Sequence, residues 1–233
     1  MSEGRVEEAY MRLKERAVNF QFRPGERINE IGISRELAVS RTPLREALNR
    51  LVTEQLIDFK PGLGFFCREL DARSVYELYE LREILELAAV RKACESASDA
   101  DLKALNDDLL ANGLIYVGKT VREVTERDEA FHVAIAELSG NHELARHLQQ
   151  INQRIRFIRW LDMSSRVKET KGEHKAIMEA MLDRDADRAA EILGKHIRRR
   201  MDQIVASVKE GFSNIYMAGP EELFDRQFEP QED

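Results

Sequence analysis

Four side chains in the second half of the chain have the types and spacing of metal ligands. Asp128 and His132 are separated by one helical turn, a spacing that places both on one helix face. His174 and His196 fall on two later predicted helices and border apolar stripes, so both imidazoles can point inward. One carboxylate and three imidazoles suit a divalent ion such as zinc, nickel or manganese, and helical bundles build such sites in their cores. The residue types also allow a metal-free polar cluster held by hydrogen bonds.

The helices that carry these side chains follow from the apolar periodicity after Asp71. No alternating strand pattern appears there, so we expect an all-α bundle of about six helices. The predicted helices cover residues 71–94, 99–117, 120–138, 142–161, 165–182 and 185–209. Asp71, Thr120 and Asp185 are residue types that cap helix starts. Residues 213–233 form an acidic tail, of which 225–233 are expected to be disordered.

A second chemical pattern lies in residues 40–51 (SRTPLREALNRL), which is typical of a DNA-reading helix. Thr42 and Pro43 predict a helix start, because threonine can accept an orphan amide hydrogen and proline sacrifices no hydrogen bond there. The apolar stripe of this helix consists of Leu44, Ala47, Leu48 and Leu51. Arg41, Arg45 and Asn49 lie on the opposite face. Arginine suits guanine edges and phosphates, and threonine and asparagine make shorter polar contacts.

The surroundings of this helix indicate a winged helix-turn-helix over residues 1–70. Residues 30–37 form a short amphipathic element, separated from the reading helix by room for a tight turn only. Residues 56–67 contain two apolar runs around a proline and two glycines, which predicts a hairpin. A further helical stripe, over residues 6–20, ends at the turn of residues 22–26.

The charge of the chain is divided unevenly between its parts. The net charge is -7, yet residues 1–70 hold 12 basic and 11 acidic residues, so the acidity belongs to the remainder. DNA affinity depends on where the cations lie, and an acidic body should weaken nonspecific binding. Cys67 and Cys94 are expected to be packed thiols in a reducing, cytoplasmic setting. No apolar run reaches the length needed to span a bilayer.

In residue order, the segments FRPGERINE and SRTPLREALNRLVTEQLI, followed by the glycine-containing wing, resemble the N-terminal domain of the GntR family of bacterial transcription regulators. The resemblance implies that Ser40, Arg41, Thr42 and Arg45 contact DNA and that Gly64 lets the wing approach the backbone. Two positions depart from the family pattern. Ala38 stands where glycine is usual, and Gly32 stands where a helix-favouring residue is usual, so the second helix is expected to begin late or to be less rigid.

The second part of the chain, residues 71–212, resembles the effector domain of the FadR-like (FCD) branch of this family. The similar segments are LYELREILELAAVRKA, DEAFHVAIAELSGN and EHKAIMEAMLDRDADRAAEILGKHI. The resemblance implies that Asp128, His132, His174 and His196 coordinate a metal, and it implies a homodimer. It also places Arg82 toward the effector cavity, with Arg156 a second candidate of this kind. His142, His147, Arg154 and Arg159 are expected outside the site, with the arginines on an exposed face.

The resulting hypothesis is a ligand-responsive transcription regulator, a repressor that senses a small organic acid and binds an inverted-repeat DNA operator as a dimer. It is not expected to be an enzyme. Two alternatives stay open. A metal-dependent hydrolase would use Glu129 or Glu173 as a base, and a metal-free scaffold would only dimerise the DNA-binding heads.

Overall fold

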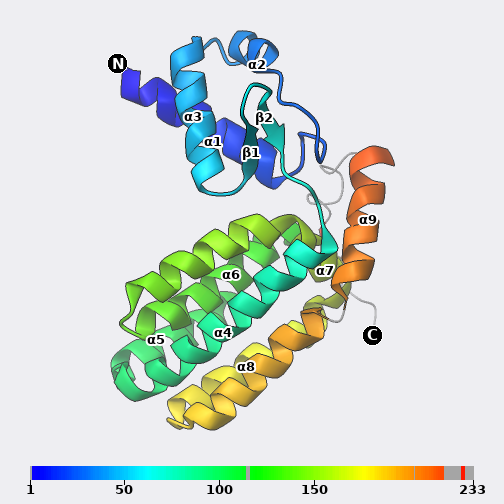
Figure 1. Cartoon of the computed structure of the whole chain (residues 1–233). Coiled ribbons are helices and arrows are strands. Elements are labelled where there is room, and N and C mark those ends of the chain that lie inside the picture. The colour runs from blue at the N-terminus through cyan, green and yellow to red at the C-terminus, as the bar shows by residue number, and fades with distance from the viewer. Residues whose placement is uncertain (1, 114–115, 202, 218–226, 229–233) are drawn as a thin grey trace. The chain divides into compact units, whose positions relative to one another are not determined.

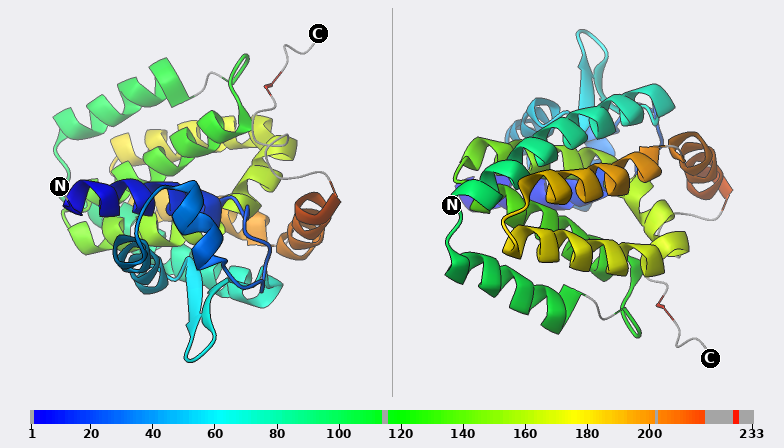
Figure 2. Two further views of the ribbon diagram at one scale, coloured as in Figure 1. Left: turned by 90° about the horizontal axis from the view of Figure 1, so that it is seen from above. Right: turned by 90° about the horizontal axis from the view of Figure 1, so that it is seen from below.

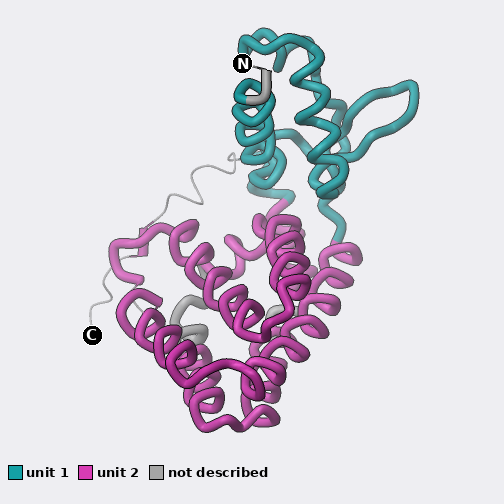
Figure 3. Tube along the Cα trace, turned by 90° about the vertical axis from the view of Figure 1, so that its left-hand side faces the viewer, with its two compact units in different colours: residues 1–71, 212–221 teal, residues 72–211, 222–233 magenta. Residues whose placement is uncertain are grey.

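The computed structural model describes residues 2–113, 116–201, 203–217 and 227–228. The chain divides into two compact units, one of residues 1–71 and 212–221 and the other of residues 72–211 and 222–233 (Figure 3). The last described helix therefore contributes residues to both units.

The first unit is a winged helix-turn-helix, as the sequence predicts (Figure 1). Its elements are α1 (Ser2–Val18), α2 (Glu30–Glu36), α3 (Arg41–Thr53), β1 (Ile57–Lys60) and β2 (Gly64–Cys67). Helix α1 contacts α3, and their apolar stripes are buried. The most enclosed side chains of this core are Leu13, Ala17, Leu44, Leu48 and Leu51. Burial of these stripes fixes α3 with its polar face outward.

Helix α2 begins at Glu30, so the late start expected from Gly32 is wrong, while the reduced rigidity stays a prediction. The Asn29 side chain caps the helix by accepting a hydrogen bond of 3.0 Å from the Gly32 amide. A Cβ at Gly32 would stand 2.9 Å from Asn29 Nδ2, so glycine leaves room for this cap. In the following turn Ala38 has a φ of +52°, the left-handed conformation for which the family uses glycine.

Helix α3 begins at Arg41, which corrects the predicted start at Thr42 and Pro43. Ser40 is the N-cap residue by its extended backbone, although its side chain makes no capping hydrogen bond. Pro43 is the third helical residue. A proline is tolerated there because the first four amides of a helix have no partner within it.

The wing is an antiparallel hairpin in which Ile57 pairs with Cys67 and Lys60 with Gly64. Gly64 has a φ of +100°, a backbone conformation that favours glycine. The hairpin projects beyond the helices of its unit, as both views of Figure 2 show in cyan. The segment before α2 runs along β2, since the Ile28 amide donates to the Phe65 carbonyl at 2.8 Å.

The second unit is helical throughout its described part. Its elements are α4 (Ala72–Ser96), α5 (Asp99–Asp108), the π-helical turn η1 (Leu109–Gly113), α6 (Val121–Leu138), α7 (His142–Leu182), α8 (Ala186–Met201) and the first part of α9 (Ile204–Met217), which passes into the first unit at Phe212. Helices α4, α6, α7 and α8 pack against one another and enclose a core (Figure 1). The side chains buried in it include Val90, Ile135, Ile155, Met181 and Leu193.

Three predicted helix boundaries are wrong. Residues 142–161 and 165–182 belong to the single helix α7, which continues because no proline interrupts it and Asp162 and Met163 are buried within the bundle. Residues 185–209 instead form the two helices α8 and α9, although neither proline nor glycine stands at the break. The helix expected over 99–117 ends at Asp108 and continues as η1.

Two predicted caps are present. Thr120 forms a reciprocal capping box with Glu123 at the start of α6, and Asp185 Oδ1 accepts a hydrogen bond from the Arg188 amide at 3.0 Å. Helix α9 extends to Met217, into the predicted tail. The expected disorder of residues 225–233 falls mostly outside the described residues, within which Gln227 and Phe228 bridge to Thr120 and Val117.

Both cysteines are packed thiols, as the sequence predicts. Cys67 on β2 and Cys94 on α4 are buried and free of disulfides. Burial raises the pKa of Cys67 to about 12 and also raises that of Cys94, so neither forms much thiolate near neutral pH. None of the described helices is long and apolar enough to cross a membrane.

Candidate metal centre and DNA-reading face

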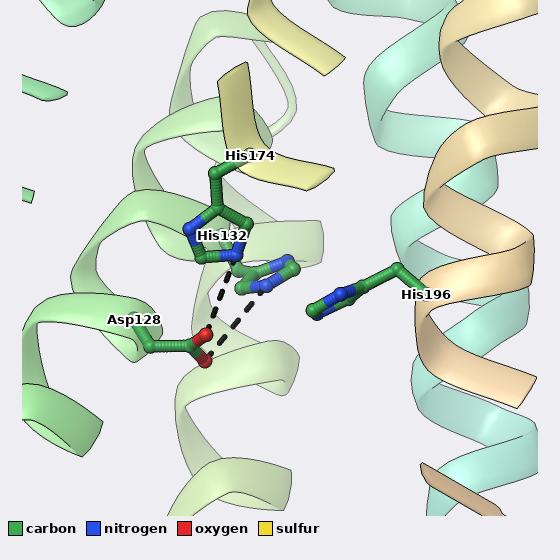
Figure 4. A group of neighbouring side chains, drawn as sticks. All are labelled: Asp128, His132, His174 and His196. Carbon is green, nitrogen blue, oxygen red and sulfur yellow. Dashed lines mark ion pairs between the residues drawn. The ribbon is translucent and has the colours of Figure 1, made fainter. Parts of the chain in front are cut away.

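Asp128, His132, His174 and His196 converge in the core of the helical unit (Figure 4). Asp128 and His132 come from α6, His174 from α7 and His196 from α8. All four are buried, and one potential ligand atom from each lies within 4.8 Å of the others. Ligand atoms bound to one zinc ion at its usual bond lengths lie about 3.3 Å apart, so small side-chain shifts suffice to coordinate an ion.

The polar atoms at the centre of this cluster fit a cation. Asp128 Oδ1 lies 3.3 Å from His174 Nε2, and Asp128 Oδ2 lies 3.9 Å from His132 Nε2. The three imidazole ring centroids are 5.1 to 5.2 Å apart. Asp128 Oδ1 and His132 Nε2 are buried without a hydrogen-bond partner in the described part of the chain. Buried polar atoms normally have partners, so both atoms are suited to ligate an ion.

Two further carboxylates orient the imidazoles. Glu86 Oε2, from α4, lies 2.5 Å from His132 Nδ1, and Glu173 Oε2, from α7, lies 2.7 Å from His196 Nδ1. A carboxylate that accepts the Nδ1 proton fixes the ring orientation and leaves Nε2 as a ligand atom. Such carboxylate–histidine pairs commonly surround metal sites in proteins. The donor set is therefore compatible with a metal site.

Arg159 is buried beside the cluster, so its predicted place on an exposed face is wrong. Its guanidinium donates from Nη2 to Asp128 Oδ2 and from Nη1 to Asn152 Oδ1, the latter at 3.2 Å. Burial alone would raise the pKa of Asp128, but Arg159 and then the three histidines hold it well below its usual value. Asp128 is thus kept as an anion in the protein core.

Arg82 is buried near the cluster, as expected, but it is already engaged. Its Nε donates to Glu86 Oε1 at 2.5 Å. Burial opposes ionisation of Glu86, yet Arg82 and His132 lower the pKa of this carboxyl to about 2. Arg82 Nη2 is buried and has no hydrogen-bond partner among the described residues, so one donor of the guanidinium stays open to a ligand.

Arg156 lies apart from the cluster. It pairs with Glu129 and lines a surface groove of about 410 Å³ between α6 and α7, together with Gln149, Asn152 and Gln153. Asp128 and His174 instead border a void of about 10 Å³, space for at most one water molecule. His142 and His147 are exposed on α7 and lie outside the site, in line with the expectation.

The candidate DNA contacts form the outer face of the first unit. Ser40, Arg41, Thr42, Arg45 and Asn49 lie on α3 or directly before it, and all five are exposed. A shallow groove along α3 is lined by Thr42, Arg45 and Asn49. The Arg45 guanidinium lies 5.6 Å from the Phe65 ring centroid, which places the arginine between the helix and the wing.

The comparisons with known proteins agree with these two units. The family described as bacterial regulatory proteins, gntR family, matches residues 5–67, and the FCD domain matches residues 77–199. The Nta operon transcriptional regulator of Aminobacter aminovorans is 43% identical over 203 residues, which cover 86% of this chain and 94% of the relative. The chain is a GntR-family regulator with an FCD domain. The HTH-type transcriptional repressor GlaR of Escherichia coli is 26% identical and covers 82% of this chain and 91% of its own.

Solved structures share the fold of this GntR-family chain. A transcriptional regulator of Rhodococcus sp. RHA1 has a TM-score of 0.65 at 21% identity and covers 87% of this chain and 98% of its own. Escherichia coli McbR/YncC has a TM-score of 0.61 at 22% identity and covers 89% of this chain and 98% of its own. The role follows from the family match and the relatives, which are named as transcriptional regulators. The chain is therefore a DNA-binding transcription regulator.

Sequence reasoning misses the residues that contact the Asp128–His132–His174–His196 cluster. The local pattern does not point to Glu86, suggests Glu173 only as the base of an enzyme, and predicts an exposed Arg159. Glu86 carries a weak signal, because it lies one turn after Arg82 on the same helix. Nothing in the local sequence distinguishes Arg159 from an exposed helical arginine.

Proposed function

We propose that this protein is a cytoplasmic, ligand-responsive repressor whose FCD domain holds a divalent metal on Asp128, His132, His174 and His196. The observation that carries the proposal is the convergence of these four buried residues with two carboxylates behind the imidazoles. Three imidazoles and one carboxylate suit zinc first, with nickel and manganese as alternatives. A bound ion would supply a Lewis acid that attracts an anionic ligand.

The effector that suits this site is a small organic acid. Its carboxylate meets the ligand cluster, and Arg82 Nη2 offers a buried donor nearby for a second polar group. Arg156 is a weaker anchor, because its guanidinium pairs with Glu129 and faces a separate groove. The void of about 10 Å³ beside Asp128 and His174 is too small for such an acid, so effector binding requires repacking. The effector would then bind the repacked arrangement of the FCD domain more tightly than the arrangement without effector. Such a difference in affinity is what regulation requires.

The proposal includes a homodimer on an inverted-repeat operator. Ser40, Arg41, Thr42, Arg45, Asn49 and Gly64 are the proposed DNA contacts. Helix α4 exposes Leu81 and Ile84, an apolar surface that suits a subunit contact. One winged head has few base contacts, so two heads related by a two-fold axis supply the specificity of a regulator.

The two alternatives have less support. Glu129 and Glu173 are the candidate bases of an enzyme, yet Glu129 pairs with Arg156 and Glu173 lies against His196. A carboxylate held by an arginine is a poor proton acceptor at neutral pH. In a metal-free scaffold, Asp128 Oδ1 and His132 Nε2 would be buried without hydrogen-bond partners among the described residues, which is unfavourable.

Elemental analysis of tag-free, full-length protein tests the metal proposal. We expect about one first-row metal per chain, lost in the His174→Ala/His196→Ala variant. The matched control is His142→Ala/His147→Ala, which removes two exposed imidazoles and should keep the metal. No metal in the wild type after incubation with zinc, nickel and manganese contradicts the proposal. Operator release by small carboxylates from the wild type, but not from the metal-site variant, tests the sensing role.

A further inference from the structure

A cleft in the first unit brings together residues from three elements. Its volume is about 440 Å³, and it is lined by Arg27 before α2, by Glu30 at the start of α2, and by Arg41 and Arg45 on α3. Arg41 and Arg45 are proposed DNA contacts, so the cleft opens on the DNA-reading face. Arg27 carries no signal of such a role in the local sequence.

Backbone hydrogen bonds fix Arg27 to the wing. Residue 27 forms a bridge with Phe66 of β2, and the flanking residues also pair with this strand. The Ile28 amide donates to the Phe65 carbonyl at 2.8 Å, and the Cys67 amide donates to the Glu26 carbonyl at 2.9 Å. Arg27 is therefore held at the edge of β2 by an isolated bridge and by the hydrogen bonds of its two neighbours.

The side chain of Arg27 lies against Gly64. A Cβ built on Gly64 would stand 3.6 Å from Arg27 Nη2, 3.7 Å from Arg27 Nε and 3.5 Å from Glu30 Oε1. The guanidinium and the carboxylate thus both lie near a wing position that has no side chain to cover them. The same Glu30 lies 3.8 Å from Arg45 Nε through Oε2.

The charges of the cleft favour an anion. Three guanidinium groups face one carboxylate, and that carboxylate lies nearest to Arg45. In the described part of the chain Arg27 forms no ion pair with an acidic side chain, and it is exposed. An exposed guanidinium beside two others is suited to accept the oxygens of a phosphate.

We infer that this cleft seats a phosphate of the DNA backbone and that Arg27 supplies its principal cation. The inference rests on the DNA-binding role of the head and adds a contact from outside the reading helix. Because Arg27 is attached to β2, the contact fixes the wing on the duplex and carries no base information. Glu30 weakens the site, since its carboxylate repels the same phosphate.

The test uses the full chain and its Arg27→Gln, Arg27→Lys and Arg12→Gln variants. Arg12 is exposed on α1 and outside the cleft, so Arg12→Gln is the matched change of net charge. The probes are a duplex selected from a random library by the wild type and a scrambled duplex of equal length. Arg27→Gln should weaken binding to both by a similar factor and flatten the plot of log K against log salt by about 0.9, the slope that one neutralised phosphate contributes. Arg27→Lys and Arg12→Gln should retain the wild-type slope.

Other results overturn the inference. Unchanged affinity and slope in Arg27→Gln, while Arg45→Ala binds the selected duplex more weakly, would show that the assay detects lost contacts and that Arg27 makes none. Weaker binding to the selected duplex alone makes Arg27 a base-reading residue. If Arg27→Gln does not fold, the wild type is tested against Glu30→Gln, which should bind both duplexes more tightly with a steeper salt slope. Equal binding by Glu30→Gln and wild type rejects a phosphate in this cleft.

Discussion

Glu173 Oε2 on α7 lies 2.7 Å from Nδ1 of His196 on α8, so a carboxylate from one helix orients an imidazole from the next. Glu173→Gln removes the charge that raises the basicity of this ring while keeping its size. We expect the affinity for zinc to fall about 10- to 100-fold, the usual effect of removing such a partner. Competition with a chelating indicator measures the affinity for zinc. Glu179→Gln, an exposed change on the same helix, is the control, and equal affinities in both variants would exclude the orienting role.

Breaking the buried Arg82–Glu86 pair should be costly, although the intact pair should contribute little net stability. Glu86→Leu leaves Arg82 buried and uncompensated, so we expect a loss of about 3–5 kcal/mol in the free energy of unfolding. Arg82→Met/Glu86→Leu should recover most of this loss, because the paired desolvation cost disappears as well. Trp160 is the single tryptophan and is buried in α7, so its fluorescence follows urea unfolding of the helical unit. Equal losses in the two variants contradict the prediction.

Acid should destabilise the folded chain by protonating the Glu86 carboxylate. The pKa of Glu86 is lowered from 4.5 to about 2 in the folded chain, so its contribution to stability is complete above the unfolded pKa. That contribution is lost as the pH falls from about 4.5 toward 2. Glu86→Gln should therefore show a weaker decline of Trp160-monitored stability over this pH range than the wild type. Parallel declines would assign the acid sensitivity to other groups.

The sequence predicts which four candidate ligands converge, but not which side chains contact them, and the reason is physical. Asp128 and His132 share one helical turn, so periodicity alone places them together. Glu86 and His132 are 46 residues apart, and their contact depends on how α4 packs against α6. Arg159 has the local pattern of a solvated arginine, and only tertiary packing beside Asp128 and Glu129 makes it a buried cation.

Ala38 should be a point of backbone strain in the DNA-binding unit. A φ of +52° costs an alanine about 1–2 kcal/mol. Glycine would relieve this cost, but its greater conformational freedom in the unfolded state would offset about half of the gain. Ala38→Gly should then stabilise the unit by up to about 1 kcal/mol. Native-state hydrogen exchange of α2 and α3 amides measures this. Ala104→Gly, an exposed change within α5 of the helical unit, should have the opposite sign, as measured by exchange of the α5 amides. A destabilising Ala38→Gly would refute the strain.

Arg45 is positioned to read a base, and its variants can separate reading from simple charge attraction. Its guanidinium lies between α3 and the wing, 5.6 Å from the Phe65 ring centroid and 3.8 Å from Glu30, so its orientation is set before DNA arrives. Arg45→Ala should weaken binding to the selected duplex by about 1–3 kcal/mol more than binding to scrambled DNA. Arg50→Ala is the control, because Arg50 is engaged by Glu7 and stacks 3.6 Å from the Tyr10 ring centroid. If Arg45→Ala weakens both duplexes equally, Arg45 contacts phosphate, and base reading passes to Arg41, Thr42 and Asn49.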